Sequence, residues 1–186
     1  MNKNYRWLKL SEEANALDNL EKAYYFIREV HNDAKAWKWV ITTMHSALYG
    51  FAICALRGTN NLGVTFDTKW GKRLISFPEA IKRSQDPKWM GMTVQSRHLQ
   101  LTSDQEHSIA RLNKEFRNGL EHYIPKLWLI ELSGIPRIIS HALDAIKFLA
   151  LESGNYNHLT ASQKKKIRSL IYQSQKILKA YRVKRT

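Results

Sequence analysis

The spacing of apolar residues constrains this chain more than any other feature, because they recur at three- and four-residue steps in five segments. Such spacing places apolar side chains on one face of an α-helix. The five segments begin near Ser11, Trp37, Ser103, Pro136 and Thr160. Two of them also open with the spacing of a capping box, at Ser103–Glu106 and Thr160–Gln163. The sequence therefore predicts an all-α fold, an antiparallel helical bundle of about five helices.

The longest uncharged run, from Val40 to Leu56, lies in the second predicted helix. It is shorter than the ~20 apolar residues of a membrane span. We predict a central core helix and no membrane span, with His45 hydrogen-bonded inside the core. The N-terminus lacks the apolar stretch of a signal peptide, and the single cysteine, Cys54, excludes an internal disulfide. These features predict a cytoplasmic protein.

A length of 186 residues is typical of one domain, so we predict a single domain over residues 1–186. Between the second and third helices, residues 58–101 form a predicted irregular insertion with one short helix after Pro78. The insertion carries aromatic residues among basic ones: Phe66, Trp70, Phe77 and Trp89. Aromatic side chains in an insertion usually anchor it to the core, and less often stack on exposed nucleic-acid bases.

The net charge of +14 favours a polyanionic partner, because a strongly positive surface attracts phosphates at long range. The positive charge is unevenly distributed along the chain, since residues 153–186 contain nine basic and no acidic residues. We predict a basic C-terminal helix and tail over residues 160–186 that binds RNA. The predicted RNA-binding residues are Lys164, Lys165, Lys166, Arg168, Lys176, Lys179 and Arg182. A helix lying on a membrane surface and a merely solvated helix are the alternatives.

The segment LNKEFRNGLEHYIP holds the residues best suited to chemistry, which are Arg117, Asn118 and His122. At ~100° per residue, Asn118 and His122 lie on one helical face, roughly opposite the apolar stripe, with Arg117 on the flank. Cleavage of RNA through its 2′-hydroxyl needs a proton-transfer group of near-neutral pKa and a cation for the charged phosphorane. Histidine and arginine supply both.

No metal is required for that reaction, because RNA carries its own nucleophile. The sequence contains no HExxH motif, no clustered Asp, Glu and His ligands, and no glycine-rich phosphate loop. We therefore predict neither a metal nor another cofactor.

The motif resembles that of the HEPN superfamily, whose ribonucleases carry Arg, four to six residues, then His in a helical bundle. The resemblance covers the motif and the helical architecture, and not the 58–101 insertion. It implies a homodimer in which two motifs meet and cut RNA without metal, leaving a cyclic phosphate. His122 would transfer the proton, Arg117 would bind the phosphate and Asn118 would position it. The resemblance also implies a toxin or phage-defence role, with an antitoxin or another partner protein.

Other interpretations remain open. Arg117 and Glu121 are four residues apart and can form a surface ion pair. His122 can simply stabilise a helix C-terminus. The protein would then be a non-catalytic RNA-binding or protein-interaction module. A DNA-binding regulator is the third interpretation, although no clear helix-turn-helix spacing supports it. His141 and Asp144 are predicted to be an exposed pair on one helix.

Overall fold

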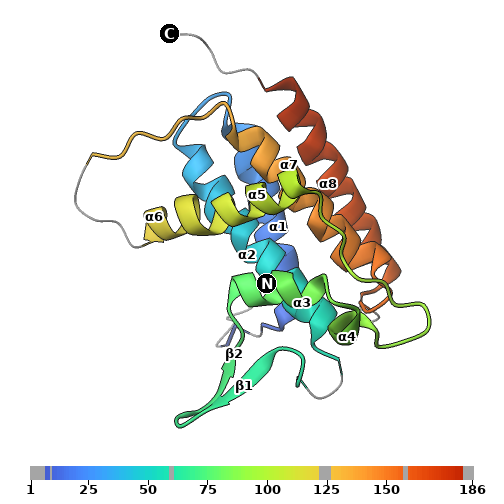
Figure 1. Ribbon diagram of the computed structural model, residues 1–186. Helices are drawn as coiled ribbons and strands as arrows, with labels where there is room; N and C mark the ends of the chain where they lie inside the picture. Colours follow the sequence, from blue (N-terminus) through green and yellow to red (C-terminus); the bar gives the residue numbers. More distant parts are fainter. Residues whose placement is uncertain (1–6, 9, 59–60, 122–126, 157–158, 182–186) are drawn as a thin grey trace.

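The computed structural model describes residues 7–8, 10–58, 61–121, 127–156 and 159–181, and these are mostly helical (Figure 1). The long helices are α1 (Glu12–Glu29), α2 (Ala36–Leu56), α7 (Ile135–Lys147) and α8 (Ala161–Ala180). Another continuous rod consists of α5 (Ser103–Arg111), a π-helical segment η1 (Leu112–Arg117) and α6 (Asn118–Glu121). A second π-helical segment, η2 (Phe148–Glu152), extends α7. The prediction of a helical protein is confirmed at this level.

The helix starts follow local hydrogen-bonding rules. The Ser11 side chain accepts the N–H of Ala14 and begins α1, as predicted. Thr160 and Gln163 form the predicted capping box of α8. The capping box predicted at Ser103 and Glu106 was wrong by one residue, since Thr102 caps α5 together with Gln105.

Helix α2 is the most deeply buried element. Fifteen of its 21 residues are buried, including every residue from Gly50 to Leu56, and α1, α3 and α7 pack around it. By length and composition α2 could cross a membrane, but 72% of its most apolar window is buried inside the protein. This is the environment of a core helix. The approach of α1 is close, because a Cβ atom added at Gly50 would lie 2.8 Å from that of Ala16.

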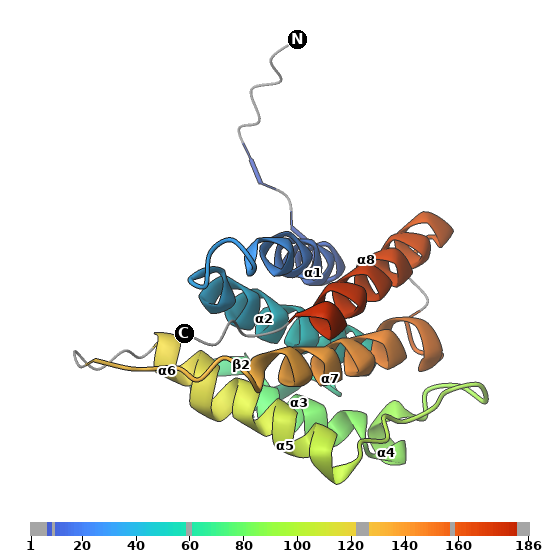
Figure 2. The same ribbon diagram turned by 90° about the horizontal axis from the view of Figure 1, so that it is seen from above.

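Helix α8 lies beside α7, which precedes it in the chain, and beside α1, which is far from it in sequence, as both views show (Figures 1 and 2). Its apolar stripe, Ile167, Leu170, Ile171 and Leu178, is buried against them. Opposite α8, the rod of α5, η1 and α6 packs on α7 and α2. The rod therefore ends, at α6, away from α8.

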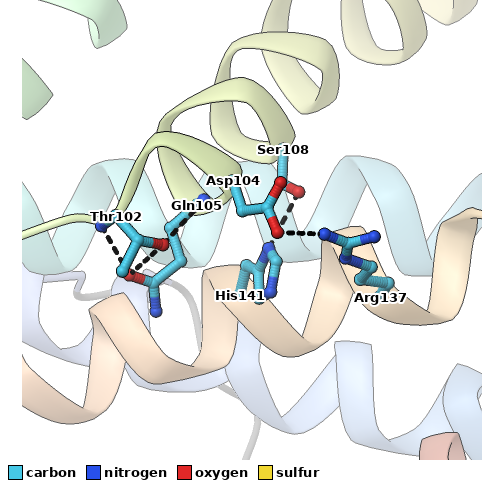
Figure 3. Close-up of polar contacts among 6 residues, drawn as sticks. All are labelled: Thr102, Asp104, Gln105, Ser108, Arg137 and His141. Atoms are coloured by element: carbon cyan, nitrogen blue, oxygen red, sulfur yellow. Dashed lines mark hydrogen bonds and ion pairs between the residues drawn. The ribbon is translucent and has the colours of Figure 1, made fainter.

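Polar contacts fix α5 on α7 (Figure 3). Asp104 forms an ion pair with Arg137, and Ser108 Oγ lies 2.8 Å from Nδ1 of His141. The predicted pairing of His141 with Asp144 was therefore wrong. The Asp144 side chain instead accepts a hydrogen bond of 2.6 Å from Gln175 of α8, because neighbouring helices offer closer partners.

The predicted irregular insertion contains regular structure. Strands β1 (Thr65–Thr68) and β2 (Gly71–Leu74) form an antiparallel hairpin, in which Phe66 pairs with Arg73. Gly71 has a φ of +101°, a conformation that favours glycine in the turn. Helices α3 (Phe77–Ser84) and α4 (Pro87–Met90) follow, so the prediction of a single short helix was wrong.

The aromatic residues of the insertion divide into two pairs. Phe77 is buried, and Trp89 is half-buried beneath the guanidinium of Arg83, 4.1 Å from the ring centre, so this pair anchors the insertion. Phe66 and Trp70 lie on the hairpin, which extends away from the helices, and are 48% and 78% exposed (Figure 1). The prediction that aromatic side chains anchor the insertion to the core is thus confirmed for Phe77 and Trp89 only.

Candidate functional site

The candidate motif begins at the last residue of η1 and continues through α6. Arg117 and Asn118 are described, and both are half-buried. His122, the predicted proton-transfer residue, lies outside the described residues, as does Arg182. The structure therefore gives geometry for two of the three predicted catalytic residues.

The π-helical segment changes the direction of the motif. Hydrogen bonds in a π-helix run from residue i to i+5, so each turn contains more residues than an α-turn. Side chains after such a segment are rotated relative to α-helical spacing. In the structure both Arg117, the last residue of the π-helical segment, and Asn118 are half-buried. Single π-turns of this kind are frequent at functional sites.

Arg117 is held by its own helix. Its Nη2 atom lies 2.6 Å from Oε2 of Glu121, and its Nη1 donates to Oδ1 of Asn118 at 3.0 Å. The ion pair predicted as the structural alternative is therefore present. The two side chains of the pair remain 30% and 41% exposed. Within the described part of the chain, the buried Nε of Arg117 has no acceptor.

His45 of α2 is buried in the core and contacts η1. It is 6% exposed, its Nε2 donates to Oδ1 of Asn113 at 3.0 Å, and its ring stacks on Phe77 at 4.3 Å. The prediction of a hydrogen-bonded core histidine is confirmed. Burial lowers the pKa of His45 to about 4, and the charge of Arg117 contributes to the same shift. The ring is therefore neutral near pH 7, and it links the motif helix to the core.

The segment after the motif folds back onto it. A Cβ atom added at Gly119 would lie 2.6 Å from the indole of Trp128, so the ring packs directly on the glycine backbone. In this extended segment the side chains alternate: Trp128 and Ile130 pack on the core cluster, while Leu127 and Leu129 are 86% and 82% exposed. Two exposed leucines therefore lie close to the motif.

The predicted RNA-binding residues of α8 are mostly accessible. Lys165, Arg168, Lys176 and Lys179 are exposed, and Lys164 is half-buried. Lys166 differs, since its ammonium forms an ion pair of 2.5 Å with Glu21 of α1. Over the described length of α8, one of the predicted cations is thus paired with a carboxylate and four others face solvent.

The structure does not bring this basic helix together with the motif in one protomer. Helix α6 and helix α8 lie on opposite sides of the molecule in both views (Figures 1 and 2). A substrate that contacts both must therefore extend around the protein or be shared between copies.

Other candidate chemistry is limited. Burial raises the pKa of the Cys54 thiol to about 12, which makes it a poor nucleophile near neutral pH. Among the described residues, no group of three or more His, Cys, Asp or Glu side chains could hold a metal ion. Comparison of the chain with protein-family models, with curated proteins and with solved structures finds no match.

The depressed pKa of His45 predicts a pH-dependent stability. Between pH 6.5 and 4 the unfolded chain binds a proton at His45 that the folded chain does not, so the free energy of unfolding falls as the pH falls. The loss is on the order of 2–3 kcal/mol. Urea denaturation of wild type and His45→Gln at pH 7 and pH 4.5 measures it, and the variant should lose less.

The exposed His107 on α5 provides the control. The His107→Gln variant should keep the wild-type difference between the two pH values. An unchanged pH difference in His45→Gln would contradict the assignment.

Proposed function

We propose that the protein is a metal-independent endoribonuclease of HEPN type, an antiparallel helical bundle that acts in the cytoplasm as a homodimer. The observation that carries the proposal is the placement of Arg117. Its guanidinium is fixed by Glu121 and Asn118 on a partly exposed surface, and four residues separate Arg117 from His122 in the sequence. In this proposal the protein acts as a toxin or phage-defence factor, restrained by an antitoxin or another partner protein.

The chemistry assigns one task to each group. A histidine removes the proton of the RNA 2′-hydroxyl, whose oxygen attacks the adjacent phosphorus. The 5′-oxygen leaves with a proton from a second acid, which gives a 2′,3′-cyclic phosphate and a 5′-hydroxyl. His122 transfers these protons, Arg117 stabilises the extra charge of the phosphorane, and Asn118 orients Arg117. Two copies of the motif supply the acid and the base together.

The ion pair with Glu121 is compatible with this role. A half-exposed pair of this kind contributes between a few tenths and about 1 kcal/mol. A phosphodiester accepts two parallel N–H bonds from a guanidinium, which are stronger than neutral hydrogen bonds. A bound phosphate can therefore displace Glu121, while Glu121 holds Arg117 in place when no RNA is present.

Cleavage of RNA in EDTA tests the proposal. Wild-type protein should cut single-stranded and structured RNA between pH 6 and 8 and leave a cyclic phosphate, detected by mass spectrometry. Arg117→Ala should reduce the rate by about 100-fold or more, the scale of losing one stabilising donor to the transition state. His122→Ala should abolish cleavage.

Arg111→Ala is the matched control, because Arg111 forms the same type of ion pair with Glu115 in the same rod, at 2.7 Å. It should cleave at the wild-type rate. Absence of cleavage at any pH in this range, or equal losses in Arg117→Ala and Arg111→Ala, would contradict the proposal.

The restraining role of Glu121 gives an independent prediction. Glu121→Gln removes the charge that competes with phosphate at Arg117 and keeps the side-chain shape. The variant should bind a 2′-O-methyl oligonucleotide about two- to fivefold more tightly, as measured by fluorescence anisotropy, because a competing pair of less than about 1 kcal/mol is lost. Glu115→Gln, the matched change at the other pair, should bind less tightly than Glu121→Gln. Equal affinities of the two variants would contradict the role.

The exposed leucines beside the motif support association of two copies. Leu127 and Leu129 present apolar surface next to Trp128, and apolar surface of this kind is typical of interaction sites. The double variant Leu127→Glu/Leu129→Glu should be monomeric by light scattering and should not cleave RNA. Val94→Glu changes an equally exposed apolar residue on another loop and should leave the dimer and the activity intact. A monomeric wild-type protein that cleaves would contradict the composite site.

A non-catalytic RNA-binding module is the second candidate function. It is favoured by the separation of the basic helix α8 from the motif, since binding through α8 needs neither Arg117 nor His122. RNA binding without cleavage in the assay above would select it.

A further inference from the structure

A groove runs between α1 and the second half of α8, with a volume of about 610 Å³. Its α1 side is lined by Tyr24, Arg28 and His31, and its α8 side includes Tyr172 and Lys176. Arg28, His31 and Lys176 are exposed, and no aspartate or glutamate lines the groove. The groove therefore offers positive charge and aromatic surface without local acidic groups.

The cations of this groove have no carboxylate partners within the described residues. The ion pairs of α1 and α8 join Glu13 to Arg57 and Glu21 to Lys166. Neither Arg28 nor Lys176 takes part in them. The Arg28 guanidinium instead lies over the ring of Tyr24, 5.9 Å from its centre. Charges of this kind remain available to phosphate groups.

Tyr172 is the unusual residue of the groove. It is 70% exposed, although it lies near the middle of a helix that packs on the core. The residues four before and four after it are Arg168 and Lys176, so a cation lies one helical turn away on either side. An exposed aromatic ring between two cations matches the arrangement that binds single-stranded nucleic acid, in which bases stack on rings and phosphates meet the cations.

The stripe of exposed cations extends beyond this point. At ~100° per residue, the following side chains fall within about 80° of the helix circumference: Lys165, Arg168, Tyr172, Lys176 and Lys179. The eight residue steps from Arg168 to Lys176 cover about 12 Å of helix axis. A stacked strand carries about one phosphate per 3.4 Å, so this length accommodates about three phosphates.

The ring of Tyr24 is held in place on the opposite wall. Its hydroxyl donates to Oε1 of Gln173 at 2.5 Å, and Nε2 of Gln173 donates to Ser169 at 2.8 Å. These bonds connect α1 to α8 and fix the width of the groove. The site is therefore preformed, which limits the ordering cost of binding.

We propose that this groove between α1 and α8 is a binding site for a single-stranded segment of RNA, with a base stacked on Tyr172 and phosphates held by Arg28 and Lys176. The inference rests on the RNA-binding part of the proposed function and adds the site and the single-stranded form. It is independent of cleavage, because α8 lies on the side of the molecule opposite α6 (Figures 1 and 2).

Binding of a fluorescein-labelled 2′-O-methyl oligonucleotide, which cannot be cut through its 2′-oxygen, tests the groove by anisotropy. Tyr172→Ala should weaken binding about tenfold, the scale of one lost base–aromatic stack. Tyr172→Phe should restore it, because the ring remains. Lys176→Gln should reduce the slope of log affinity against log salt by about 0.7, the value for one phosphate contact on a single strand.

Tyr25→Ala is the matched control, since Tyr25 is 57% exposed on α1 and shares its surroundings with Asp18 and Glu21. It should bind as wild type. Wild-type affinity of Tyr172→Ala, equal losses in the two tyrosine variants, or tighter binding of duplex than of single strand would overturn the proposal. So would binding of anionic phosphatidylserine vesicles with no binding of the oligonucleotide. A wild-type protein that binds the oligonucleotide through Tyr172 but cuts no RNA would leave the groove standing and remove the nuclease.

Discussion

Burial of most of α2 is the constraint on which the rest of the structure depends. A helix that is apolar all round is stable in water only if other elements cover every face. Helices α1, α3 and α7 provide most of that cover, and η1 closes the face that carries His45. A buried imidazole needs a hydrogen-bond partner, and Asn113 of η1 supplies it. The same contact holds η1 on the core and so sets where Arg117 emerges.

The sequence predicted helix starts well where hydrogen bonds between nearby residues determine them. It predicted structure less well where contacts between distant residues determine it. Ser11 and Thr160 cap their helices as predicted, because each hydroxyl stands directly before its helix and accepts the backbone N–H three residues later. At the start of α5, Thr102 and Ser103 each have Gln or Glu three positions later, so sequence spacing does not choose between them. The hairpin at 65–74 was missed because its strands are only four residues long and mostly exposed, without the alternation that identifies a half-buried strand.

The sequence predicted which residues form the candidate site, but not which neighbours their side chains contact. The ion pair of Arg117 and Glu121 follows from a separation of four residues and was foreseen. The half-burial of Arg117 was not foreseen, because the apolar spacing around Leu112 and Phe116 indicates neither the π-turn nor the segment that packs on the motif. The contact of His45 with Asn113 spans 68 positions, and the packing of Trp128 on Gly119 depends on the fold-back of the next segment. Sequence periodicity contains no information on such long-range contacts.

The separation of the motif from the basic stripe has a consequence for how an RNA would be used. In each copy α8 lies on the side of the molecule opposite α6 (Figures 1 and 2). In the proposed dimer, joined through the surface around Leu127 and Leu129, we therefore expect α8 to lie away from the shared motifs. Contacts at α8 then act on parts of the RNA that do not react. Such contacts are equally strong in the ground state and the transition state. They therefore lower the RNA concentration needed to saturate the protein, without accelerating bond cleavage. The rate of RNA cleavage would then depend on Arg117 and on the contacts that Asn118 and the core make with it. The selection of long, single-stranded substrates would depend on α8. Under the proposed function, this division would account for a charge excess on the side of the molecule opposite the candidate catalytic residues.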